Sequence, residues 1–249
     1  MGQVPRNYGL IGDGRLAKNL RHYFKLSEIS FVQWSRKGED DSTSPNSTFE
    51  ELLSTDVILL AVSDQAIPEL ISQIQKNSNA RVVHFSGAHH FEGAVGLHPL
   101  MTFTAQLQPM EFYQSIPFIF ELGGPSFSDI FPELKNPNFP IKKELKPLYH
   151  GLCVVAGNFP QLLWNEVFKQ FEEKLDIPRE LLNGYLIQSL RNTLELGETA
   201  TTGPIVRGDF NTIRQNVHSL ENSNLKAIYE NFVDAFMSKE RKRSYEVDL

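Results

Sequence analysis

A short glycine-rich segment near the N-terminus most constrains what this chain can fold into. It reads Gly12-Asp-Gly14-Arg-Leu-Ala17, directly after the apolar run 8–11 and at the start of a run with helical spacing. In such a pattern the first glycine permits a tight turn, the second lets a pyrophosphate approach the backbone, and a small third residue lets helix pack closely on strand. The segment therefore predicts the strand, turn and helix that open an α/β domain.

Up to about residue 145, short β-rich runs alternate with helical segments. Runs such as 57–62 and 81–85 lack polar alternation, which is typical of parallel strands covered by helices on both faces. The expected strands are 8–11, 30–34, 57–62, 81–85, 94–97 and 116–122. They predict a doubly wound, Rossmann-like sheet.

Two helix starts support this interpretation. Thr48-Phe-Glu-Glu51 fits a capping box, in which the first and last side chains satisfy each other's backbone amides. Asp64 follows an expected strand and is predicted to cap a helix over 65–76, with Pro68 in its first turn. The polar stretch 38–47 has no core residue and predicts a surface loop.

The character of the chain changes once, near residue 145. Segment 132–147 carries four prolines among Asn and Lys, which suits a domain boundary. Long helical patterns follow over 148–174 with an interruption at Pro160, over 178–196 with a stop at Gly197, and from Asp209 and Ser223 onward. We therefore expect an α/β domain over 1–145 followed by an all-α C-terminal domain over 146–249.

Composition excludes several classes of protein. With 249 residues, 41% hydrophobic residues and one cysteine, Cys153, the chain is typical of a globular protein without an intrachain disulfide. Its longest aliphatic run, 57–62, falls short of the roughly 18 residues of a membrane-spanning helix. The net charge of -6 disfavours nucleic-acid binding. The single cysteine and an N-terminus without the apolar core of a signal peptide predict a cytoplasmic location.

The glycine-rich segment predicts a dinucleotide site, because the unpaired amides at a helix N-terminus attract phosphates. The cofactor depends on the end of the second strand, where Ser35, Arg36 and Lys37 stand without a carboxylate. These side chains suit a 2′-phosphate, which favours NADP over NAD. Two alternatives stay open: Arg36 and Lys37 are solvated at a loop start, or Asp40 or Asp41 folds back to a ribose.

Seven motifs occur in the order seen in one bacterial family. They are Gly12–Ala17, Leu60–Ile67, Val83–Ala88, Leu97–Phe103, Lys146–His150, Gly157–Phe159 and Thr202–Asp209. On these motifs, which extend over nearly the whole chain, it resembles the family that joins a Rossmann-like NADP-binding domain to a helical C-terminal domain of unknown function. That family is related to ketopantoate reductase, pyrroline-5-carboxylate reductase and prephenate dehydrogenase.

The resemblance implies an NADP-dependent oxidoreductase that is dimeric through its helical domain, and it supplies no substrate. The chain departs from the family pattern at Ala17, which replaces a third glycine, and at Pro160, which follows Asn158 closely and affects the local helix geometry. The residues expected to bind the cofactor are Gly12, Asp13, Gly14, Arg15, Leu16, Ser35, Arg36, Lys37, Ala61, Val62 and Ser63.

Candidate catalytic residues follow the expected strands, where open α/β sheets bind ligands. His98 is the first choice for acid–base chemistry, because its reference pKa of about 6.5 allows proton exchange at neutral pH and its His-Pro turn resembles that of prephenate dehydrogenases. Ser86 could donate a hydrogen bond to substrate or nicotinamide. The alternative for His98 is a turn residue whose ring bonds a backbone carbonyl.

In the helical domain, Lys146, His150 and Asn158 share one side of a helix if that helix reaches back to Lys146. Related β-hydroxyacid dehydrogenases place Lys and Asn on the corresponding helix, so His150 and Asn158 are expected to orient substrate; the alternative is a solvated polar face. Arg207 could hold a substrate carboxylate, and Asp209 is expected to cap the next helix.

Four histidines, His84, His89, His90 and His98, lie close together in the sequence, yet neither cysteine nor an H-x-x-x-H pair accompanies them, so no metal site is expected. The leading hypothesis is an NADP(H)-dependent oxidoreductase acting on a small carbonyl, imine or hydroxyacid in an interdomain cleft. The alternatives are an NADP(H) sensor without catalysis and a binder of a methyl-group donor.

Overall fold

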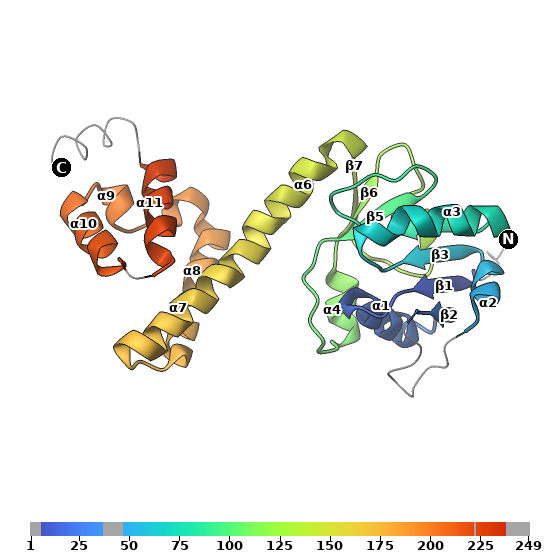
Figure 1. Cartoon of the computed structure of the whole chain (residues 1–249), viewed down its shortest axis with the longest axis horizontal. Coiled ribbons are helices and arrows are strands. Elements are labelled where there is room, and N and C mark those ends of the chain that lie inside the picture. Colours follow the sequence, from blue (N-terminus) through green and yellow to red (C-terminus); the bar gives the residue numbers. More distant parts are fainter. Residues whose placement is uncertain (1–5, 37–46, 222, 238–249) are drawn as a thin grey trace. The chain divides into compact units, whose positions relative to one another are not determined.

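The computed structural model describes residues 6–36, 47–221 and 223–237. The chain divides into two compact units, Met1–Gly157 and Asn158–Leu249. This division falls after the predicted boundary at residue 145, because helix α6 (Lys146–Cys153) begins with a buried Lys146 that is paired with Glu121 of the first unit. Figure 1 labels most of the helices and strands of both units.

The first unit is built on a seven-stranded sheet of order β2-β1-β3-β4-β5-β6-β7, which confirms the predicted Rossmann-like α/β class. Strands β1 to β5 are parallel, β6 is antiparallel to β5, and β7 is parallel to β6. The strands are β1 (Tyr8–Ile11), β2 (Phe31–Trp34), β3 (Val57–Leu60), β4 (Arg81–His84), β5 (Val95–Pro99), β6 (Phe118–Glu121) and β7 (Asn138–Ile141).

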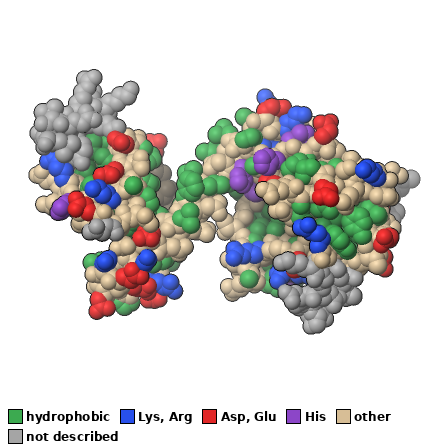
Figure 2. Space-filling view, viewed as in Figure 1, with side chains coloured by type: hydrophobic (Ala, Val, Ile, Leu, Met, Phe, Trp, Pro, Cys, Tyr) green, Lys and Arg blue, Asp and Glu red, His purple; other side chains and the backbone are tan. Residues whose placement is uncertain are grey.

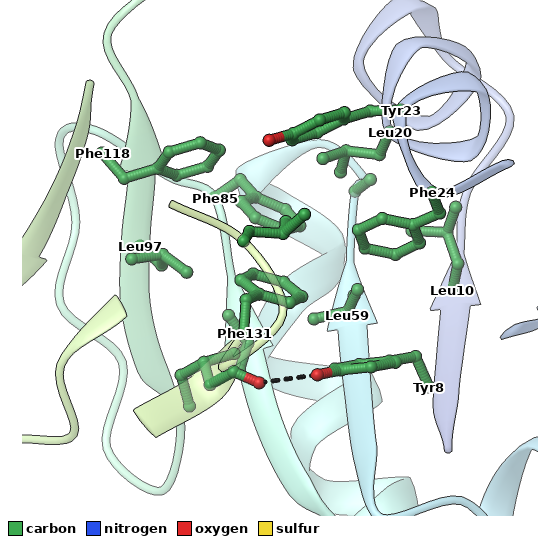
Figure 3. Packing of buried hydrophobic residues seen from close by; sticks show 14 of the residues in the cluster. Tyr8, Leu10, Leu20, Tyr23, Phe24, Leu59, Phe85, Leu97, Phe118 and Phe131 are labelled. Carbon is green, nitrogen blue, oxygen red and sulfur yellow. Dashed lines mark hydrogen bonds between the residues drawn. The ribbon is translucent and has the colours of Figure 1, made fainter. Parts of the chain in front are cut away.

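Helices cover both faces of this sheet (Figure 1). The first face packs against α1 (Arg15–Leu26), α4 (Met110–Ser115) and α5 (Phe127–Ile130), and the second against α2 (Phe49–Leu53) and α3 (Ile67–Asn77). Strand β3 is buried along its whole length, as expected for a strand with helices on both faces. In the larger cluster, drawn in Figure 3, the hydroxyl of Tyr8 donates to the carbonyl of Ile130 at 2.9 Å.

Strand β7 lies inside the proline-rich segment 132–147, whose composition predicts a domain boundary. It is an edge strand, which pairs with a neighbouring strand on one side only. Pro140 has no amide hydrogen to donate, and an edge strand tolerates this because one of its sides forms no hydrogen bonds with another strand. The preceding loop is anchored by buried Asn136, which accepts a hydrogen bond from the Tyr23 hydroxyl at 2.7 Å. The prolines therefore mark an edge strand rather than a linker.

The second unit is helical, with α7 (Phe159–Leu175), α8 (Asn183–Leu196), α9 (Pro204–Arg207), α10 (Phe210–Ser219) and α11 (Leu225–Phe236). Its buried cluster consists of Ile213, Val233 and Met237. A π-helical segment, Val154–Asn158, joins α6 to α7, and Pro160 stands in the first turn of α7, so the expected interruption is real. Among the described helices, none combines the length and apolar character needed to cross a membrane.

The cap predictions have mixed outcomes. The Thr48–Glu51 capping box is confirmed, because both reciprocal hydrogen bonds are present, and Asp209 caps α10 by accepting from the Thr212 amide at 3.1 Å. The predicted Asp64 cap is wrong. A short 3₁₀ helix, Asp64–Ala66, precedes α3, and no side chain caps it. Further 3₁₀ helices are Lys143–Leu145, Arg179–Leu182 and Gly197–Ala200.

Candidate functional site

The turn between β1 and α1 has the geometry that the glycine pattern predicted. Gly12 has a φ of +133°, and a Cβ atom there would lie 2.2 Å from the carbonyl oxygen of Ala61. Its amide donates to the carbonyl of Trp34 at 3.1 Å, and Ala17 is fully buried where α1 meets the sheet. Only glycine fits at position 12, because both the backbone conformation and the available space exclude a side chain.

The N-terminus of α1 is open. Gly14 is its N-cap, and within the part of the chain that the structure describes no side chain caps the helix and a Cβ atom at Gly14 would meet nothing within 4 Å. The first turn holds no acidic side chain. Amides in the first turn of a helix have no intrahelical partners and favour an anion, so this turn fits a pyrophosphate.

Gln33 supports the turn, and sequence reasoning missed it. It is buried in β2, donates to the Gly12 carbonyl at 3.3 Å and accepts from the guanidinium of Arg21 at 2.7 Å. A buried amide needs such partners, so the side chain ties β2, the turn and α1 together. The available signal was one polar residue inside an otherwise apolar strand.

Three of the predicted cofactor segments begin side by side at one edge of the sheet. Ile11 pairs with Trp34 and with Leu60, so the residues after β1, β2 and β3 start at the same level. They are Gly12–Leu16, Ser35 with Arg36, and Ala61–Ser63. Arg36 is exposed, whereas Lys37, Asp40 and Asp41 lie outside the described residues. The edge is the one where open α/β sheets bind ligands.

Ser86, which follows β4, is buried and hydrogen-bonded on both sides of its hydroxyl. It donates to Asp64 Oδ2 at 3.0 Å and accepts from the His89 amide at 3.1 Å. This bond explains why Asp64 does not cap α3. In this structure the Ser86 hydroxyl donates its single proton to Asp64. Donation from Ser86 to substrate or nicotinamide stays a prediction.

The structure brings His98 and His150 together within the first unit. Their ring centroids are 6.3 Å apart, with His98 on β5 and His150 on α6. Gly87 makes room for both rings, because a Cβ atom there would lie 2.8 Å from His150 Cδ2 and 3.0 Å from His98 Nε2. Histidine side chains gather on the surface of this unit in Figure 2.

The environment of His98 keeps its ring neutral at pH 7. Burial is the main reason that the pKa of His98 is lowered to about 4, and the nearby His150 and Lys146 contribute to the same shift. Its Nδ1 lies 2.7 Å from the hydroxyl of Tyr149, so the ring partner is a phenol rather than the backbone carbonyl of the alternative interpretation. A neutral imidazole offers one N–H donor and one acceptor.

Lys146 does not stand free beside His150, as the helical spacing had allowed. It is 3% exposed, and its Nζ lies 2.9 Å from Oε1 of buried Glu121. His90 Nδ1 lies 2.6 Å from the other carboxylate oxygen. A Cβ atom at Gly96 would lie 2.3 Å from Glu121 Oε1, so the pair needs a glycine beside it. The geometry assigns Lys146 to a buried ion pair.

The remaining candidate residues are His84, Asn158 and Arg207, and their surroundings differ. His84 is fully buried, its Nδ1 accepts from the Ser86 amide at 3.2 Å, and burial lowers its pKa to about 3. Asn158 begins the second unit and is exposed, and Arg207 is exposed at the end of α9. Within the described residues, no group of three His, Cys, Asp or Glu side chains has the arrangement of a metal site.

Comparison with known proteins agrees with this fold. Residues 124–235 match the family described as Domain of unknown function (DUF2520). No curated protein matches the chain. A Bacteroides fragilis protein, provisionally assigned as an NADP oxidoreductase, is 22% identical with a TM-score of 0.78, covering 93% of this chain and 98% of its own.

Two further solved structures are similar over most of the chain. Plasmodium falciparum pyrroline carboxylate reductase with NADP bound is 17% identical with a TM-score of 0.57, covering 95% of this chain and 98% of that chain. An imine reductase from Myxococcus stipitatus in complex with NADP+ is 10% identical with a TM-score of 0.61, covering 94% and 96%. The chain therefore carries the DUF2520 pattern over residues 124–235 within the fold that these reductases share.

Proposed function

We propose that this protein is an NADP(H)-dependent oxidoreductase acting on a small carbonyl, imine or hydroxyacid. The observation that carries the proposal is the open helix N-terminus behind Gly12 and Gly14, at the sheet edge where the half-buried His98 and His150 also lie. Proteins of the same fold, a pyrroline carboxylate reductase and an imine reductase, hold NADP. Bound nicotinamide would supply or accept the hydride.

The chain's own residues have separate tasks in this proposal. Residues Gly12–Leu16 would hold the pyrophosphate, Ala61–Ser63 would border the cofactor, and Ser35, Arg36 and Lys37 would hold the 2′-phosphate. His98 would donate a hydrogen bond to the substrate, beside His150. The substrate-orienting role of Asn158 stays a prediction.

Cofactor binding tests the first half of the proposal. NADPH at about 100 times its Kd should raise the free energy of unfolding by about 2.7 kcal/mol. Arg36→Ala should weaken NADPH about tenfold or more and leave NADH nearly unchanged, because only NADPH has the phosphate that a guanidinium binds. Lys76→Ala, which removes a charge from exposed α3, is the control and should leave both affinities unchanged. Equal losses for both cofactors in Arg36→Ala would remove the NADP assignment.

Turnover tests the second half. A panel of carbonyls and imines would be screened for NADPH oxidation by the wild type and by His98→Ala in parallel. Loss of activity in the variant supports His98, whereas full activity would exclude it from the reaction and leave the oxidoreductase proposal standing. Stabilisation by NADPH without turnover of any compound would favour the sensor, the alternative that needs no acid or base beside the cofactor.

We also propose that the protein forms a homodimer through its helical unit. Large apolar side chains on and beside α8 are exposed, including Leu181 at 72%, Tyr185 at 70% and Leu194 at 77%. Apolar surface of this kind marks a protein interface more often than a free face. Sedimentation should show a dimer that Leu190→Glu with Leu194→Glu converts to monomers. A wild type that stays monomeric at all concentrations would refute the dimer.

A further inference from the structure

The contact between His98 and Tyr149 joins β5 to α6. The Tyr149 hydroxyl lies 2.7 Å from His98 Nδ1, and the two rings meet edge to face with centroids 5.5 Å apart and an interplanar angle of 81°. A side-chain hydrogen bond of this length holds the imidazole in one orientation. Tyr149 therefore determines which nitrogen of His98 remains for another partner.

Both rings are neutral, so the position of two protons decides the direction of this bond. Burial raises the pKa of Tyr149, and burial together with the charges of His150 and Lys146 lowers that of His98 to about 4. A neutral imidazole carries its hydrogen on only one nitrogen. If the phenol donates to Nδ1, the imidazole hydrogen is on Nε2. If Nδ1 donates to the phenol, the imidazole hydrogen is on Nδ1 and Nε2 is unprotonated.

The relative strengths of the donors and acceptors around the Tyr149 hydroxyl, which include Cys153, distinguish these two arrangements. Cys153 lies one helical turn beyond Tyr149 on α6 and interacts with the same hydroxyl. The phenol has one proton, and it can donate that proton either to an imidazole nitrogen or to a sulfur atom. Sulfur is a weak partner in either role, so the thiol does not set the direction. A phenol is a more acidic donor than a neutral imidazole N–H, and an imidazole nitrogen is a stronger base than a phenol oxygen, so the phenol proton goes to His98 Nδ1. The hydrogen of the imidazole is then on Nε2.

The Nε2 atom faces the backbone of Gly87. A Cβ atom at residue 87 would lie 3.0 Å from Nε2, and among the hydrogen bonds of the described residues none involves this nitrogen. His150 from α6 borders the same space. A donor in this position, without a side chain in front of it, can meet a carbonyl oxygen or imine nitrogen.

We propose that Tyr149 is a positioning residue, which holds His98 in the tautomer that presents Nε2–H beside Gly87 to the acceptor atom of a neutral carbonyl or imine substrate. This inference rests on the proposed function for the substrate and on the Tyr149–His98 contact for the tautomer. The two parts can be tested separately. Tyr149 itself touches neither substrate nor cofactor in this proposal.

Nuclear magnetic resonance of the ring nitrogens tests the tautomer without any substrate. The chain has seven histidines, so the His98 signals are assigned by their loss in His98→Gln. At pH 7 the wild type should show Nε2 protonated and Nδ1 bare, and Tyr149→Phe should populate the other tautomer. Tyr185→Phe removes the hydroxyl of an exposed tyrosine and should change nothing.

Two results would overturn the proposal. One is a wild-type His98 protonated on Nδ1, which needs no variant and so decides the matter even if Tyr149→Phe does not fold. The other is a folded Tyr149→Phe whose His98 tautomer is unchanged. Where a substrate is known, Tyr149→Phe should lower kcat about tenfold with little change in KM. Absence of turnover in the wild type would refute the proposed function and leave the tautomer result valid.

Discussion

Gly12→Ala should destabilise the first unit by roughly 2 to 6 kcal/mol, the sum of about 1–3 kcal/mol for a left-handed backbone and about 1–3 kcal/mol for a steric clash. Position 12 has a φ of +133°, and the new methyl group would lie 2.2 Å from the Ala61 carbonyl oxygen. The neighbouring strands resist adjustment, because Ile11 pairs with Leu60 and its carbonyl accepts from the Ala61 amide at 2.9 Å. Urea unfolding measures the loss.

Gly14→Ala is the matched control, because the same methyl group enters a different environment two residues later. Its φ is -73°, and apart from the adjoining chain no atom of the described residues lies within 4 Å of the position that a Cβ would take. Stability should therefore change by less than about 1 kcal/mol, whereas NADPH binding should be lost, because the methyl group occupies the space proposed for the pyrophosphate. A Gly12→Ala protein as stable as the wild type would contradict the turn geometry described above.

The second large effect is expected from the buried ion pair. Lys146→Met should destabilise the protein by about 3–5 kcal/mol, because Glu121 would keep a buried charge without its ammonium partner. Combining Lys146→Met with Glu121→Gln removes both charges and should recover more than half of that loss. Lys143→Met, in the exposed turn before α6, should stay within about 0.5 kcal/mol of the wild type.

Denaturant unfolding of the two single variants, the double variant and the control measures the coupling between Lys146 and Glu121. Strict additivity of the single effects would show that the pair contributes nothing together. The result also bears on function. A substrate-binding role for Lys146 predicts that Lys146→Met is stable and binds substrate weakly. The ion pair predicts that Lys146→Met is destabilised and that its folded form keeps its substrate binding.

Local signals were sufficient for much of the fold. The Gly12–Ala17 pattern, the apolar run 57–62 and the Thr48–Glu51 capping box each depend on neighbours within a few residues. The turn and the capping box are present as predicted, and the predicted strand over 57–62 is present as the shorter β3, Val57–Leu60. Strand β7 is not predicted by the sequence, because its prolines are typical of linkers. The order of the strands in the sheet, which places β7 at an edge that tolerates proline, depends on the tertiary structure. The sequence places Asp64 at the start of the helix that follows it, whereas its partner, Ser86, lies in the loop after β4.

The residues near the candidate site show the same distinction. His98 and Ser86 could be chosen from the sequence because the ends of parallel strands lie at one edge of a sheet, and Gly12 because its chemistry is local. That His98 meets Tyr149 and His150, and that Lys146 pairs with Glu121 instead of standing beside them, depends on how α6 packs against β5 and β6. The amino-acid pattern alone thus determined the elements and the phosphate turn, since both arise from short-range sterics and hydrogen bonding. Only the tertiary structure decided which polar side chains face one another, because these contacts join residues far apart in the chain.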